Sequence, residues 1–225
     1  MKTTILMIPL IALGATGINN STGMTRHSEV TNIASTIALT NPVKPAFFHG
    51  DELMEIMNKM MKDMEAQPMK GNVDLDFASM LKLHHQGAID MAKVELQDGK
   101  DGSMKKMAQK IIDMQTKEVA DLDQLIASLQ SAPKNYDPMN KTAGPAKAMA
   151  DNMMTMKKMG HMSMGSVDHE FADMMIKHHS DGVAMAKSII AFSKTVKLRS
   201  MAQKSIPEQG TQIKEFKQWT SQHKG

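Results

Sequence analysis

An internal repeat constrains the fold of this 225-residue chain more than any other feature of its sequence. Residues 73–128 align without a gap onto residues 167–222, at an offset of 94. The identities fall on the same Phe, Met, His and Ala positions, so that His84 of the first copy corresponds to His178 of the second. Duplication of one structural unit is the best explanation for this pattern.

Each copy is predicted to form a helical hairpin, because its apolar residues recur at spacings of three and four. The pattern predicts long helices over residues 74–98, 101–130, 168–192 and 195–222. Asp is a favoured N-cap, so Asp74 and Asp168 are expected to cap the first helix of each copy. Pro207 lies inside the last helix, where we expect a kink or a break because proline has no backbone N–H.

The scarcity of aromatic residues favours helices packed on helices. Only one Trp, one Tyr and six Phe are present, so the core must be built from Met, Leu, Ile, Val and Ala. The sequence therefore predicts an all-α four-helix bundle of two duplicated hairpins, each preceded by a shorter Met-rich helix. We expect the bundle to occupy residues 51–225, with repeats at 51–130 and 145–223.

The first 50 residues are expected to lie outside this bundle. A basic start at Lys2 and an apolar run of about a dozen residues predict a secretory signal peptide over residues 1–17. Residues 18–50 are rich in Thr, Ser and Asn and predict a flexible tether. We therefore expect a periplasmic or secreted protein without a membrane span after signal removal.

Methionine is abundant and cysteine is absent, with 26 residues of the former and none of the latter. Methionine usually fills core gaps, but many methionines here lie beside histidine or in Gly- and Ser-containing sequence. Thioethers and imidazoles favour Cu(I), and a thioether forms no disulfide in an oxidising compartment. The formal net charge of only +3 and the absence of a basic, aromatic-rich stripe argue against nucleic acid binding.

The first helix of each copy carries histidine and methionine on one face. Met80, His84 and Met91 fall within about 80° of arc, and His85 lies about 100° round, at the edge of the stripe. A single histidine on an apolar face is more often a core residue than a ligand. Here both copies repeat a Met-x₃-His pair, whose members can close on one ion. The predicted ligands are Met80, His84, His85, Met91, Met174, His178, His179 and Met185.

Methionines on the shorter helices ahead of each copy are further candidate ligands. They share one helix face, for which a core stripe is the alternative explanation. On the leading helix they are Met54, Met57, Met61 and Met64. Ahead of the second copy the arrangement recurs at Met149, Met153 and Met156.

Two more groups complete the predicted ligands. His84 and Met91 are about 10.5 Å apart along the helix axis, so each needs partners from other helices, for which Met107 and Met114 are candidates. The strongest local signal is a loop with four soft ligands flanked by glycines, which could fold around one ion. These loop residues are Met159, His161, Met162 and Met164. Affinity at histidine ligands is expected to fall as pH drops through about 6 to 7.

The residues around both histidine pairs resemble a known family. The shared pattern is Phe77-x₂-Met80-x₃-His84-His85-x₅-Met91-Ala92, and it recurs from Phe171 to Ala186. It resembles the ferritin-like domain-of-unknown-function family 305, whose best-described member type is an exported, Met-rich copper-binding protein. The resemblance covers most of residues 51–223 and implies a ferritin-like bundle that binds copper through Met and His. Its implied partners are copper ions and another extracytoplasmic copper protein or exporter.

Other classes of function predict different residues. A paired iron site needs inward Glu and Glu-x-x-His motifs. This chain has no Glu-x-x-His motif and few Asp or Glu on the Met/His stripe, so we expect no enzyme of that kind. Non-covalent haem with Met and His axial ligands is one alternative. A metal-free secreted interaction module with Met-rich contact surfaces is another. The sequence favours an exported copper-binding protein for copper buffering, trafficking or resistance, with Cu(I) preferred and Cu(II) or Ag(I) as alternatives.

Overall fold

The computed structural model describes residues 49–158 and 165–223, and within these ranges the chain is helical and contains no strand. The helices are α1 (His49–Ala66), α2 (Val73–Asp98), α3 (Gly102–Leu129), α4 (Gly144–Met156), α5 (Val167–Phe192) and α6 (Val196–Gln222). The prediction of an all-α bundle is confirmed. Each bound of the four long helices differs from its predicted position by no more than one residue.

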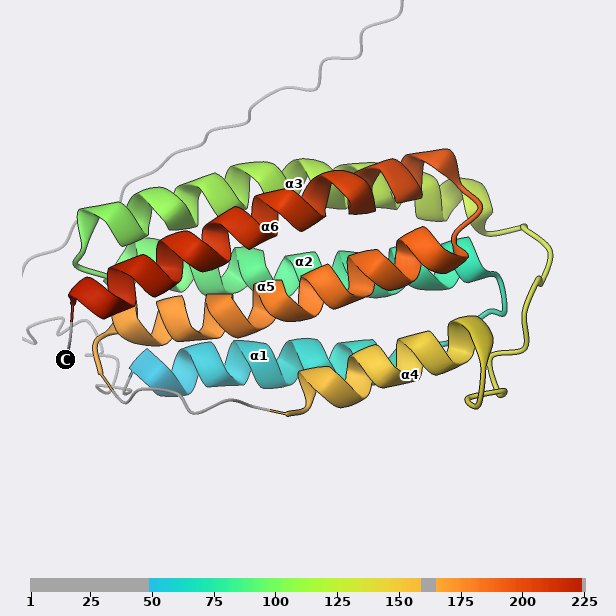
Figure 1. Cartoon of the computed structure of the whole chain (residues 1–225), viewed down its shortest axis with the longest axis horizontal. Coiled ribbons are helices and arrows are strands. Elements are labelled where there is room, and N and C mark those ends of the chain that lie inside the picture. The colour runs from blue at the N-terminus through green and yellow to red at the C-terminus, as the bar shows by residue number, and fades with distance from the viewer. Residues whose placement is uncertain (1–48, 159–164, 224–225) are drawn as a thin grey trace, which may run out of the picture. The chain divides into compact units, whose positions relative to one another are not determined.

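The two hairpins of the repeat form the centre of the fold. Helix α2 packs on α3, α5 packs on α6, and the two hairpins meet where α2 contacts α5. Figure 1 shows α2 and α5 between a layer of α3 with α6 and a layer of α1 with α4. Because α2 and α5 are covered on both sides, they are buried around most of their circumference.

Reciprocal contacts tie the two repeats together at both ends. The carboxylate of Asp74, at the start of α2, accepts hydrogen bonds from the backbone N–H groups of Lys194 and Thr195 in the α5–α6 turn. The carboxylate of Asp168, at the start of α5, accepts from Lys100 and Asp101 in the α2–α3 turn. Each carboxylate therefore fixes the turn of the other repeat, and the contacts obey the 94-residue offset of the sequence.

The predicted capping role of these two aspartates is wrong. The N-caps are the preceding polar residues, Asn72 for α2 and Ser166 for α5, whose side chains accept from backbone N–H groups of the first turn. Asn and Ser satisfy those groups as well as Asp does. Asp74 and Asp168 are thus available for the turns of the partner hairpin.

Of the kink or break predicted at Pro207, the break does not occur, because α6 continues through that residue from Val196 to Gln222. The proline removes one N–H donor from the helix. Packing of the buried residues Phe216 and Trp219 beyond the proline keeps the second half of α6 against the bundle. Tertiary burial outweighs the loss of that single backbone hydrogen bond.

A buried pair of carboxyl groups lies at one end of the bundle. Glu95 on α2 is fully buried, and its carboxyl lies next to that of Asp168 on α5. Burial, together with the charge of Asp168 and hydrogen bonding to it, raises the pKa of Glu95 to about 9. Glu95 therefore carries a proton in the folded protein at neutral pH.

The predicted signal peptide lies outside the described residues, as does the tether except for its last two positions. His49 and Gly50, which were predicted to end the tether, begin α1 instead. In the part of the chain that the structure describes, no helix combines the length and the apolar character needed to cross a membrane.

Candidate metal centre

Four histidines from the two repeats meet in the interior of the bundle, and we call them the histidine cluster: His84, His85, His178 and His179. The rings of His84 and His178 stack with their centroids 3.7 Å apart. Each also lies near its chain neighbour, at 6.3 Å for His84 and His85 and 5.9 Å for His178 and His179. All four side chains are at most 1% exposed. The α2–α5 contact thus joins the duplicated histidine pairs, which sequence alone could not place together.

Most of the ring nitrogens in the histidine cluster have no hydrogen-bond partner in the protein. Neither nitrogen of His84 or of His179 has a hydrogen-bond partner, and the Nδ1 atoms of His85 and His178 have none either. His178 uses Nε2 to bond the backbone oxygen of His84, at 2.9 Å. An unsatisfied buried polar group lowers the free energy of unfolding by about 1–3 kcal/mol, so these nitrogens destabilise the metal-free fold. A bound metal ion would take up the lone pair that each neutral ring carries on one of its two nitrogens.

The second histidine of each pair has a different neighbour in the two repeats. His85 Nε2 lies 3.1 Å from the carboxylate of Glu118 on α3. At the equivalent position on α6 the residue beside His179 is Gln212. The two halves of the cluster are therefore electrostatically unequal, although their histidines match.

Three histidines of the cluster, His84, His178 and His179, are held neutral. Burial lowers the pKa of both His84 and His178 well below the usual value, and neighbouring histidines lower it further. Burial also lowers the pKa of His179 to about 4, a shift that the neighbouring Gln212 side chain partly offsets. Neutral imidazoles keep the lone pair that a metal needs. These lowered pKa values place protonation of the three rings below the range of about pH 6 to 7 that the sequence predicts for histidine ligands.

The methionines of the predicted stripe lie before and after the histidine pairs along α2 and α5. Met80, Met91, Met174 and Met185 are all at most 1% exposed and belong to the same core. His85 and His179 are predicted to lie at the edge of the stripe, but both are fully buried. Helices α3 and α6 cover that edge. Glu118 of α3 lies beside His85, and the ring centroid of Phe216 on α6 lies 6.0 Å from that of His179.

The remaining predicted ligands fall into four groups. Met57, Met64 and Met156 are buried in the core, whereas Met54, Met61, Met107 and Met153 are half-buried against it. Met114 lines a surface groove beside Lys110 and Lys117 and is not part of that core. The loop ligands Met159, His161, Met162 and Met164 lie outside the described residues.

Carboxylate and imidazole groups alone do not build a metal site in this fold. Among residues 49–158 and 165–223, no three His, Asp or Glu side chains converge so as to hold an ion. Thioethers would have to complete any coordination shell around the histidine cluster. Such a mixed shell fits a soft ion such as Cu(I) better than it fits a hard one.

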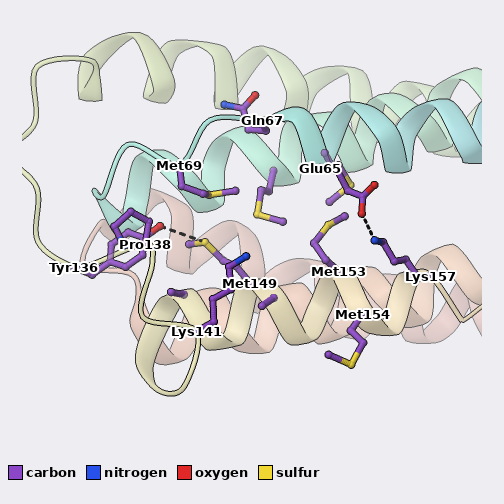
Figure 2. Close-up of a pocket in the computed structure, with 14 residues that line it drawn as sticks. Glu65, Gln67, Met69, Tyr136, Pro138, Lys141, Met149, Met153, Met154 and Lys157 are labelled. Atoms are coloured by element: carbon purple, nitrogen blue, oxygen red, sulfur yellow. Dashed lines mark hydrogen bonds and ion pairs between the residues drawn. The ribbon is translucent and has the colours of Figure 1, made fainter.

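A second gathering of thioethers lies between α1, α4 and the segment that joins α3 to α4. There, a pocket of about 420 Å³ is lined by 14 residues, of which six are methionine: Met64, Met69, Met80, Met149, Met153 and Met154. Figure 2 shows the Met149 and Met153 side chains extending from α4 toward α1. Sequence reasoning missed Met69 and Met154, because Met69 lies in a loop and Met154 lies off the predicted methionine face.

Comparison with known proteins gives one family and one group of solved structures. A family profile described as Domain of unknown function (DUF305) matches residues 40–126 and 74–220. "CopM in the Cu(I)-bound form" is 28% identical, with a TM-score of 0.51, and the match covers 68% of this chain and 98% of that chain. A search of curated proteins found no significant match.

Two further CopM structures give similar values. "CopM in the Ag-bound form (by soaking)" is 26% identical over 68% of this chain and 98% of that chain, with a TM-score of 0.51. "CopM in the Cu(II)-bound form" is 27% identical over 66% of this chain and 97% of that chain, with a TM-score of 0.50. The similarity therefore extends over nearly the whole of each of these three CopM chains.

Proposed function

The chain belongs to the DUF305 family, and from that premise we propose that it is an exported copper-binding protein. It holds several Cu(I) ions through Met and His and serves copper buffering, trafficking or resistance in the periplasm or outside the cell. Cu(II) and Ag(I) are further ions it accepts, since the CopM structures similar to it contain Cu(I), Cu(II) or Ag. We propose binding and transfer of the ion rather than catalysis.

The observation that carries this proposal is the pair of unpartnered ring nitrogens on His84. An imidazole kept neutral by burial, with both nitrogens unsatisfied, is poised to give a lone pair to a metal. Met80 precedes His84 by one helical turn, and Met174 precedes His178 in the same way. We propose one Met–His pair of this kind on each of α2 and α5, related by the repeat.

The choice of Cu(I) follows from ligand softness. Thioethers bind Cu(I) without losing a proton and cannot be removed as ligands by disulfide formation. Imidazole is a stronger donor that also accepts Cu(II). The partners that fit such a carrier are copper ions and an extracytoplasmic copper protein or exporter that exchanges them.

An anaerobic Cu(I) titration against a chromophoric chelator tests the proposal, with Zn(II) titrated in parallel. We expect the protein to withdraw several Cu(I) equivalents from the chelator and to bind Zn(II) weakly, because the sites are rich in thioether. Failure to compete for any Cu(I) would contradict the proposal and favour a metal-free interaction module. Preference for Zn(II) would contradict the proposed ligand set.

A further inference from the structure

A methionine-lined pocket lies between α1 and α4, and we call it the thioether pocket. Its outer methionines, Met69 and Met153, are half-buried, and its inner ones, Met64 and Met80, are each 1% exposed. Met80 lines the pocket and also lies one helical turn before His84. Met80 therefore belongs both to the pocket lining and to the face of α2 that carries His84.

The walls of the pocket are held in place by contacts at both ends. Backbone N–H groups of Asn135 and Tyr136 donate to the carbonyl of Gly71, at 2.8 and 3.2 Å, and attach the α3–α4 segment to the α1–α2 link. The Tyr136 hydroxyl donates to Asp76, at 2.6 Å, and lies 3.6 Å from the sulfur of Met149. The Met149 thioether is thus positioned by a fixed tyrosine on the pocket wall.

The opposite end of the pocket carries an ion pair. Lys157, at the end of α4, pairs with Glu65 on α1, as Figure 2 shows. The only carboxylate that lines the pocket is therefore neutralised by a lysine. Hard ions such as Ca²⁺ and Mg²⁺ need several free oxygen ligands, which the pocket does not supply. The six thioethers of the pocket therefore suit a soft ion.

We propose that the thioether pocket is a Cu(I)-binding site through which the ion enters and leaves the histidine cluster. Met69, Met149 and Met153 capture the ion from solvent, and Met80 passes it to His84. The inference rests on the proposed function, and it adds a distinct site and a route. At about 420 Å³ the pocket is much larger than one ion, so its flexible methionines must close around the metal.

The test compares two triple variants of the full chain in anaerobic Cu(I) titrations and in stopped-flow loading from a weak Cu(I) chelator. The pocket variant is Met69→Leu, Met149→Leu and Met153→Leu, which removes the thioethers and keeps volume and apolarity nearly constant. The control variant is Met104→Leu, Met139→Leu and Met175→Leu, at methionines that do not line the pocket. Circular dichroism and thermal unfolding establish that both variants are folded.

The expected result is a loss of about one Cu(I) equivalent and roughly tenfold slower loading of the remaining sites in the pocket variant. The control variant should match the wild type in both respects. If the wild type binds Cu(I) and the pocket variant keeps its full capacity and rate, the pocket is only loose apolar packing and the inference is overturned. If the wild type itself takes up no Cu(I), the proposed function fails, and the inference fails with it.

Discussion

Replacing His84 with leucine is expected to stabilise the metal-free protein by roughly 1–3 kcal/mol and to weaken its Cu(I) binding about 100-fold. Both nitrogens of His84 are buried without a partner, so leucine removes an unsatisfied polar group at similar volume. The hydrogen bond from His178 survives, because its acceptor is the backbone oxygen of residue 84. The same change removes the ligand that we place at the centre of the copper site. Stability and function should therefore move in opposite directions.

Urea unfolding of the metal-free protein and competition for Cu(I) measure these two effects. His223→Leu is a suitable control, because His223 is partly exposed and its Nδ1 already bonds the backbone oxygen of Trp219, at 2.9 Å. That variant should show neither a gain of stability nor a loss of copper affinity. A His84→Leu protein that is less stable and still binds copper normally would mean that His84 is an ordinary core residue.

Replacing Glu95 with glutamine is expected to stabilise the protein by roughly 2–4 kcal/mol at pH 8 and to have little effect near pH 4.5. Burial and the neighbouring Asp168 raise the pKa of Glu95 from 4.5 to about 9 in the folded state. Between these two values the folded chain retains a proton that the unfolded chain has lost. The free energy of unfolding therefore falls as pH rises through this window, and glutamine, which cannot ionise, removes that loss.

Urea unfolding of the wild type and Glu95→Gln at pH 5 and pH 8 provides the measurement. Lys105 and Asp101 also act on Glu95, in opposite directions, and both are unchanged in the variant. Glu55→Gln, at an exposed position of α1, is the control and should leave the pH dependence as it is. Equal stability of Glu95→Gln and wild type at pH 8 would show that Glu95 is ionised in the folded protein.

Much of the fold could be predicted because the chain contains a duplicated, regular hairpin. Helix periodicity and the 94-residue offset were enough to place all four long helices, because each repeat is a regular hairpin bounded by glycine, proline or polar caps. They were not enough to show that Asp74 and Asp168 exchange contacts between hairpins. That exchange depends on how the two repeats meet, which spacing within one repeat does not specify.

In the candidate site, the sequence predicts residues that are close on one helix, but not residues that meet from different helices. The spacing of Met80 and His84 on one helix face was visible in the sequence, and the structure places both in the core. The stacking of His84 on His178 depends on the α2–α5 contact, 94 residues apart. The thioether pocket combines Met69 of a loop with Met149 and Met153 of α4, so no single sequence segment could have revealed it.

The histidine cluster and its neighbouring thioethers form the proposed Cu(I) site. Anomalous diffraction at the copper edge, from crystals of the protein loaded anaerobically with Cu(I), tests it most directly. We predict an anomalous peak within bonding distance of a ring nitrogen of His84 and the sulfur of Met80. Anomalous peaks confined to the protein surface, with the interior around His84 empty, would contradict the account.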